Sequence, residues 1–89
     1  MLALPAVLTH GQALEVAQGL KAQVAAQPVN LVLDASALMQ FDSSALAVML
    51  ACRREAAAAG KTFAVYGLPA RLKQLAGLYG VAALIPGAI

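Results

Sequence analysis

The chain has 89 residues, of which 62% are hydrophobic and only 11% are charged, and its formal net charge is +2. This length supports a single domain, which we expect over residues 1–89, and the low charged share indicates that apolar surface is buried against a protein partner. The six basic residues form no dense stripe, which argues against nucleic-acid binding. The sequence contains no uninterrupted run of roughly 20 apolar residues, so we expect no membrane span. Because no basic and apolar leader opens the sequence, we expect a cytoplasmic protein.

The first third of the sequence predicts one strand and one helix. Residues Leu2–Leu8 are apolar, but Pro5 lacks a backbone N–H, which predicts an edge strand or a strand with a break. From Gln12 to Ala26 apolar side chains recur at helical spacing, and Pro28 prevents the helix from continuing. The residues expected to face the core are Leu14, Ala17, Leu20 and Val24.

The middle third predicts a buried strand and a longer helix. Residues Val29–Asp34 form a compact apolar run, which is typical of a central strand, and a loop over 35–41 follows. Asp42, Ser43 and Ser44 are strong helix-start residues, and the helix that they open is expected to end at Gly60. Its predicted core stripe consists of Ala45, Met49, Cys52 and Ala56. Cys52 is the single cysteine, which excludes an internal disulfide and a CxxC metal pair.

The last third predicts a strand, a helix and one further short strand. Lys61–Tyr66 alternates and is rich in β-branched and aromatic residues, and Pro69 suits the first position of a helix that continues to Tyr79. Val81–Ile85 predicts the final strand. Strands that alternate with helices imply βαβ crossovers. The expected fold class is therefore α/β, a single compact domain with a mostly parallel, mixed sheet and helices.

The loop after the predicted central strand is the best candidate for a functional site, because sites in α/β sheets gather at the carboxyl ends of strands. Asp42 and Ser43 open a helix there, and free backbone N–H groups at a helix start favour an anion such as a phosphate. Asp34 and Asp42 would repel that phosphate. The alternative is structural: Asp42 or Ser43 only caps the helix, a role worth about 1 kcal/mol.

Catalysis is not expected from these residues. A serine nucleophile needs a base, but His10 is the only histidine, lies in a predicted turn and is expected to face solvent. No G-x-S-x-G pattern surrounds Ser43 or Ser44. The two aspartates have no further acidic or histidine companions in sequence, so we expect neither a metal site nor a cofactor.

The stretch Val29–Leu50, VNLVLDASALMQFDSSALAVML, resembles the signature of STAS domains: a hydrophobic strand ending in D-x-S, a loop, and D-[ST]-x-[GA]-L at a helix start. The stretch Phe63–Ile85, FAVYGLPARLKQLAGLYGVAALI, is similar to the family's later strand, turn and helix. Its closing segment is most similar to MlaB-like members, the STAS subunits of Mla phospholipid-transport ABC complexes. The resemblance to anti-sigma-factor antagonists such as SpoIIAA is more distant.

The resemblance implies a STAS-like (SpoIIAA-like) fold and a non-catalytic domain that works by docking. Ser43 matches the family's functional hydroxyl. In MlaB-like members this hydroxyl contacts the ATPase subunit of an ABC transporter, which supports transporter assembly and outer-membrane lipid asymmetry. In anti-sigma-factor antagonists it is phosphorylated by an anti-sigma factor kinase. The residues expected on the docking surface are Asp42, Ser43, Ser44, Leu46, Ala47, Leu50, Arg54 and Arg71.

Two features of the sequence bear on these alternatives. Ala47, Leu50, Ala51 and Ala58 extend the apolar surface of the helix beyond one stripe, which indicates a second neighbour and favours the transporter function. With that function the protein is cytoplasmic and reaches the inner membrane through its partner. Ala45 stands where the family often has glycine, and the first predicted strand matches the family's second strand. Both functions need a small hydroxyl at a helix start. A third alternative, a sensory or scaffold STAS module in a larger signalling assembly, would use the same surface, and all three stay open at this point.

Overall fold

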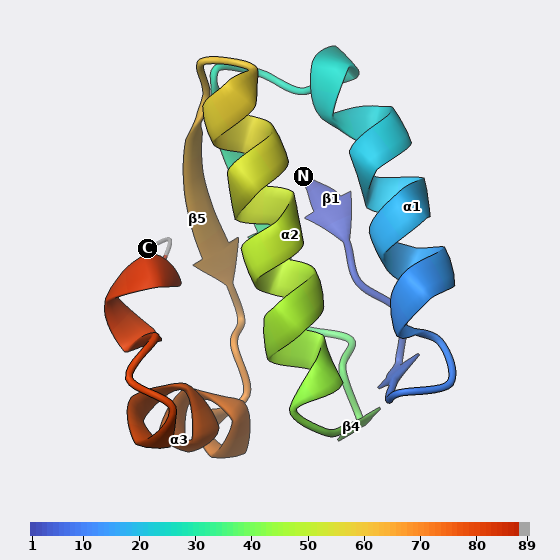
Figure 1. Cartoon of the computed structure of the whole chain (residues 1–89), viewed down its shortest axis with the longest axis vertical. Coiled ribbons are helices and arrows are strands. Elements are labelled where there is room, and N and C mark those ends of the chain that lie inside the picture. Colours follow the sequence, from blue (N-terminus) through green and yellow to red (C-terminus); the bar gives the residue numbers. More distant parts are fainter. Residues whose placement is uncertain (88–89) are drawn as a thin grey trace.

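The computed structural model describes residues 1–87 and shows short strands alternating with three α-helices (Figure 1). The elements are β1 (Leu2–Ala3), β2 (Val7–Leu8), α1 (Ala13–Gln23), the 3-10 helix η1 (Val24–Ala26), β3 (Asn30–Asp34), β4 (Gln40–Phe41), α2 (Ser44–Ala58), β5 (Thr62–Tyr66), α3 (Ala70–Leu78) and the 3-10 helix η2 (Ala82–Leu84). No helix within residues 1–87 is long and apolar enough to cross a membrane.

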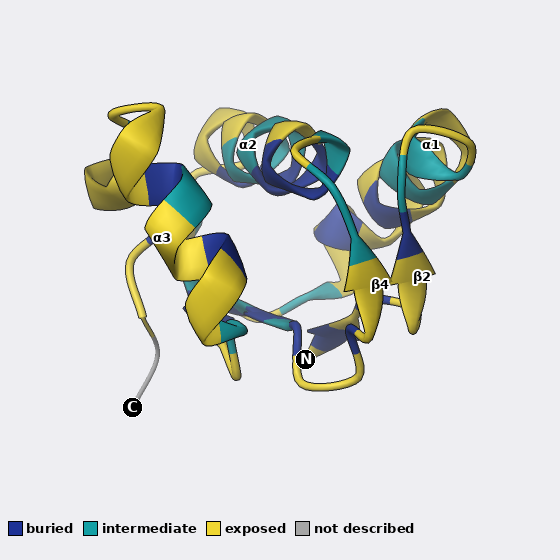
Figure 2. Ribbon diagram, turned by 90° about the horizontal axis from the view of Figure 1, so that it is seen from below, coloured by how far each residue is buried: buried dark blue, intermediate teal, exposed yellow. Residues whose placement is uncertain are grey.

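Strand β3 is the centre of a parallel three-stranded sheet in the order β1-β3-β5. The register pairs Leu33 with Leu2 on one side and with Val65 on the other. Helices α1 and α2 connect consecutive strands of this sheet, and both lie on the same side of it (Figure 2). The predicted α/β class and the predicted central strand are therefore confirmed.

The core fills the space between this face of the sheet and the helices. Leu31 and Leu33 of β3 are 1% and 0% exposed, as expected for a central strand. The largest fully buried side chains are Leu2, Leu8, Leu31, Leu33, Met49, Val65 and Leu72. On α2 the predicted core stripe of Ala45, Met49, Cys52 and Ala56 is buried. These contacts fix which side of α2 faces solvent, and thereby fix the candidate site.

The N-terminal apolar run is interrupted, as Pro5 predicted. Its first half is β1, which forms an edge of the three-stranded sheet, whereas its second half, β2, pairs in parallel with β4 over Val7–Gln40 and Leu8–Phe41. The small β2-β4 sheet is visible in Figure 2. Strand β4 lies inside the segment that was expected to be a loop over 35–41.

Three predictions about individual elements are wrong. Leu14 is 72% exposed, whereas Leu20 and Val24 are buried as expected, and Ala17 and the unpredicted Val16 pack against the core. Val29 is exposed and precedes β3. The segment Val81–Ile85 is a 3-10 turn and not a strand, because Leu84 and Ile85 donate backbone hydrogen bonds within the segment, to Val81 and Ala82.

Gly67 follows β5 and lies against the turn at the end of β3. Its φ is +69°, and a Cβ at this position would lie 2.8 Å from the Cβ and 3.0 Å from the Cα of Ser36. The approach is close because the backbone N–H of Ala35 donates to the carbonyl of Tyr66 at 2.8 Å. A side chain is therefore excluded here both by the backbone conformation and by space.

We expect Gly67→Ala to lower the free energy of unfolding by about 2 kcal/mol, because it combines a strained φ with a backbone clash. Gly19→Ala is the matched control. Gly19 lies inside α1, and a Cβ added there would meet nothing within 4 Å, so the exchange should raise stability by up to about 1 kcal/mol. Urea denaturation of both variants measures the difference. Equal effects of the two substitutions would contradict the close approach at Gly67.

Candidate functional site

Asp34 ends β3 and holds the turn that follows it. Its Oδ1 accepts hydrogen bonds from the hydroxyl of Ser36 at 2.6 Å and from the backbone N–H of Ser36 at 2.9 Å. These two bonds, the side-chain bond first, hold the pKa of Asp34 below its ordinary value of 3.8. The carboxylate is therefore occupied within its own turn.

Asp42 anchors the start of α2. One carboxylate oxygen accepts a hydrogen bond from the backbone N–H of Ser44 at 2.8 Å, and the other accepts one from the backbone N–H of His10 at 3.1 Å. These bonds, the one from Ser44 first, lower the pKa of Asp42 from its ordinary value of 3.8. Asp42 thus caps the helix and also fixes the turn after β2, a segment 32 residues away in sequence.

Ser43 is the residue just before α2, but its hydroxyl does not cap the helix. Its backbone carbonyl accepts the N–H of Leu46 at 3.1 Å, while its side chain is exposed and forms no hydrogen bond with any residue of the range 1–87. Asp42, and not Ser43, therefore caps the helix. The Ser43 hydroxyl stands at the positive end of a 15-residue helix and is accessible to a partner.

A stripe of small and apolar residues continues from Ser43 along the outer side of α2. Ser43, Ala47, Leu50 and Arg54 recur at spacings of four, three and four, which places them on one side of a helix, and we call them the outer stripe. Ala47 and Arg54 are exposed and Leu50 is half-buried. The stripe is therefore a continuous surface that starts with a hydroxyl and ends with a cation.

Leu46 does not belong to this surface. It was expected on the docking face, but it is only 3% exposed and lies in the core. The reason is that α2 is apolar on most of its circumference, so its sequence does not distinguish the side that packs on the sheet from the side that faces solvent. Asp42 and Ser44 are half-buried, and their contribution to a surface is correspondingly limited.

Arg71, near the start of α3, lies beside the loop that leads into α2. It lines a surface hollow together with residues of the β2-β4 pair. The hollow is formed by Val7, Thr9, Met39, Gln40, Phe41 and Arg71. Met39 is 78% exposed, and Arg71 forms no ion pair within residues 1–87. The sequence predicted Arg71 as a surface residue of the site but did not predict Val7 and Met39. The β2-β4 pairing, which brings these residues together, has no signal in the local sequence.

Two further residues with reactive side chains, His10 and Cys52, lie outside the outer stripe. His10 is exposed, as expected, and it meets Asp42 through its backbone. Burial raises the pKa of the Cys52 thiol to about 11, so this buried sulfur is a protonated core group. In the part of the chain that the structure describes, no group of three or more His, Cys, Asp and Glu side chains could hold a metal ion.

The Asp42 bonds predict a pH dependence of stability. Because the folded pKa of Asp42 is lowered, the carboxylate stabilises the native state above the ordinary value of 3.8 and loses that effect as the pH falls through the folded pKa. Wild type should therefore exceed Asp42→Asn in urea midpoint at pH 7, and the gap should narrow as the pH falls below 3.8, the ordinary value. Ser43→Ala, which removes no titratable group, is the control and should follow wild type. Since Asn caps helices about as well as Asp, a gap that is independent of pH would contradict a stabilising role for the Asp42 charge.

Comparison with known proteins places this site in a family. A family model described as "Mlab, STAS domain" matches residues 1–86. No curated protein matches the chain. The matched range includes β3, the Asp42 cap, Ser43 and all three α-helices. The chain therefore belongs to the STAS domain family, in the group described as MlaB.

Proposed function

We propose that the chain is a non-catalytic accessory subunit that binds the ATPase of an Mla-like ABC phospholipid transporter and supports its assembly and activity. STAS domains generally have regulatory or accessory roles, and the MlaB description of the matching family supports this class of partner. The observation that carries the proposal is the exposed Ser43 hydroxyl. Because Asp42 caps the helix, the Ser43 hydroxyl makes no capping bond, and it lies at the start of the outer stripe.

The outer stripe has the physical properties of a helix docking face. Ser43 and Ala47 are small, so a partner backbone or helix approaches the first turns of α2 closely without steric conflict. Leu50 supplies apolar area that loses water on association. Arg54, and Arg71 beyond the loop, supply guanidinium groups that form forked hydrogen bonds with carboxylates. The partner surface that fits this face is a helix or loop with small and apolar residues and at least one acidic side chain.

The proposed partner also determines the location. An ATPase of an ABC transporter works on the cytoplasmic side of the membrane, so the subunit would be held there, at the inner membrane, through protein contacts alone. In this arrangement the chain contributes no membrane-inserted element of its own.

A second candidate function is that of an anti-sigma-factor antagonist controlled by phosphorylation of Ser43. The same exposed hydroxyl favours it, because a kinase needs an accessible oxygen at a chain segment that it can approach. A phosphate on Ser43 would stand next to the Asp42 carboxylate, which the bonds to Ser44 and His10 hold in place. The added repulsion would strain the cap, and the phosphate would change the charge of the outer stripe from positive to negative.

Substitution of Ser43 tests the docking role. With the ABC-type ATPase encoded nearest to its gene, the wild-type chain should co-purify, and Ser43→Arg and Ser43→Asp should reduce recovery roughly tenfold through steric conflict and burial of an unpaired charge. Ala22→Arg, at an exposed position of α1, is the matched control and should co-purify like wild type. Transporter ATPase activity is the second readout. Wild-type recovery of both Ser43 variants would show that the docking face lies elsewhere.

Ser43→Ala separates docking from stability. Since the hydroxyl makes no capping bond, the exchange should change the free energy of unfolding by less than about 0.5 kcal/mol, below the value for a lost cap. Urea denaturation measures this difference, and a loss of about 1 kcal/mol or more would show that Ser43 does cap the helix. The antagonist alternative is checked by the intact mass of the protein from its own organism and by co-purification with an anti-sigma factor kinase. A phosphorylated Ser43 together with no recovery of the ATPase would favour that alternative.

A further inference from the structure

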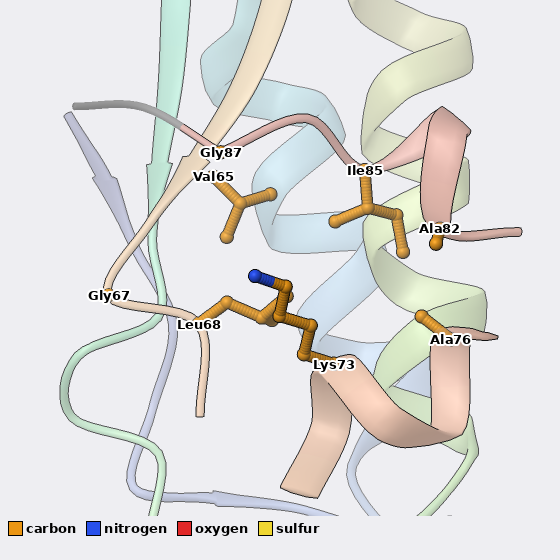
Figure 3. Close-up of a pocket in the computed structure, with 8 residues that line it drawn as sticks. All are labelled: Val65, Gly67, Leu68, Lys73, Ala76, Ala82, Ile85 and Gly87. Atoms are coloured by element: carbon orange, nitrogen blue, oxygen red, sulfur yellow. The ribbon is translucent and has the colours of Figure 1, made fainter. Parts of the chain in front are cut away.

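A pocket separate from the outer stripe opens between β5, α3 and the C-terminal turn (Figure 3). It has a volume of about 310 Å³ and is lined by Val65, Gly67, Leu68, Lys73, Ala76, Ala82, Ile85 and Gly87. Val65, Ala76 and Ile85 are buried and belong to the core. None of the lining residues belongs to the outer stripe or to the hollow beside Arg71.

Lys73 is the one charged group of this pocket. Its side chain leaves α3 and points into the pocket towards Val65, with Ala82 and Ile85 on the far side (Figure 3). Within residues 1–87 no carboxylate forms an ion pair with Lys73, and the sequence has no Asp or Glu after Glu55. Lys73 is exposed, so its ammonium group keeps contact with water, but it lies at an otherwise uncharged, largely apolar pocket, where an anion would be its natural neighbour.

The size and lining of the pocket specify the ligand further. A water-sized group occupies about 30 Å³, so the pocket accommodates roughly ten non-hydrogen atoms, at the lower end of ligand sites. Apolar walls and a single cation at one point suit a short hydrocarbon chain that ends in one negative charge. A phosphate monoester carries up to two negative charges, whereas Lys73 is the only charged side chain of the lining.

An extended peptide is a poorer occupant of the same place. A peptide that adds a strand needs free backbone groups on the edge of β5. The N–H of Val65 is already bonded to the carbonyl of Pro86 at 2.8 Å, and Gly87 forms a bridge with Val65. The edge of the sheet is thus occupied at the pocket, which leaves side-chain contacts and the ammonium group for recognition.

We propose that this pocket binds a small amphipathic monocarboxylate, with the carboxylate at Lys73 and a medium-length hydrocarbon chain along Val65, Leu68 and Ile85. This site is independent of the proposed docking function, since it uses other residues and requires no partner. Octanoate, with about ten non-hydrogen atoms, is the probe that matches the volume, and its expected dissociation constant is on the order of 0.1–1 mM.

The test is a titration of the full chain with octanoate, followed by amide chemical shifts. Shifts should saturate and map to the lining residues. Lys73→Met, which keeps an apolar stem and removes the charge, should weaken binding roughly tenfold, and Lys73→Arg should restore most of it. Ala82→Leu should fill the pocket and abolish binding, whereas Ala83→Leu, at the neighbouring exposed residue outside the lining, should bind like wild type.

Ligand controls separate the two parts of the proposal. Acetate lacks the hydrocarbon chain and octanol lacks the charge, so each should bind at least roughly tenfold more weakly than octanoate. Absence of saturable shifts, equal binding of octanol, or unchanged affinity of Lys73→Met would each overturn the proposal. Unfolding curves of every variant confirm that a loss of binding does not reflect a loss of fold.

Discussion

The carboxylate of Asp42 joins two distant parts of the chain at the place where the proposed function is located. One oxygen binds the first turn of α2 and the other binds the turn after β2. Because Asp42 satisfies the helix start, the hydroxyl of Ser43 is left without a partner inside the described range and faces solvent. A helix cap and an accessible hydroxyl are thereby provided by two neighbouring residues.

The rest of the proposed docking face depends on how α2 packs against its neighbours. Its buried residues pack between the sheet and α1, and this packing turns the outer stripe towards solvent. The composition, with 62% hydrophobic residues, leaves apolar side chains outside the core in any arrangement of so short a chain. Met39 and Val7 in the hollow beside Arg71 are examples. Gln40 and Phe41 of the same hollow directly precede Asp42, so the hollow adjoins the start of α2.

Helix α3 contributes one residue to the hollow near the start of α2 and another to the pocket beside β5. Arg71 lines the hollow near the start of α2, whereas Lys73, two positions later, points into the pocket beside β5. Residues two apart on a helix do not face each other, so one short helix presents a cation to each of two separate surfaces. The docking proposal and the ligand proposal are therefore open to independent tests with substitutions on the same element.

The sequence by itself determined those features that depend on local chemistry. The apolar run at Val29–Asp34, the helix start at Asp42–Ser44 and the helix stop at Gly60 each act through neighbouring residues, and all are found in the structure close to their expected places. The family resemblance, carried by the segments around Ser43 and Phe63–Ile85, agrees with the matching family. The exposed position of Ser43 was also expected from its place at the helix start.

Only the tertiary structure decided features that depend on long-range packing. The β2-β4 pairing joins two-residue strands whose short sequences carry no detectable period. Leu46 is buried and Leu14 is exposed because the face of a helix that meets the core is chosen by its neighbours when apolar residues cover most of its circumference. The division of roles between Asp42 and Ser43 was likewise open, since both residue types cap helices equally well. It was decided by the backbone N–H of His10, which chain folding brings to the second carboxylate oxygen of Asp42.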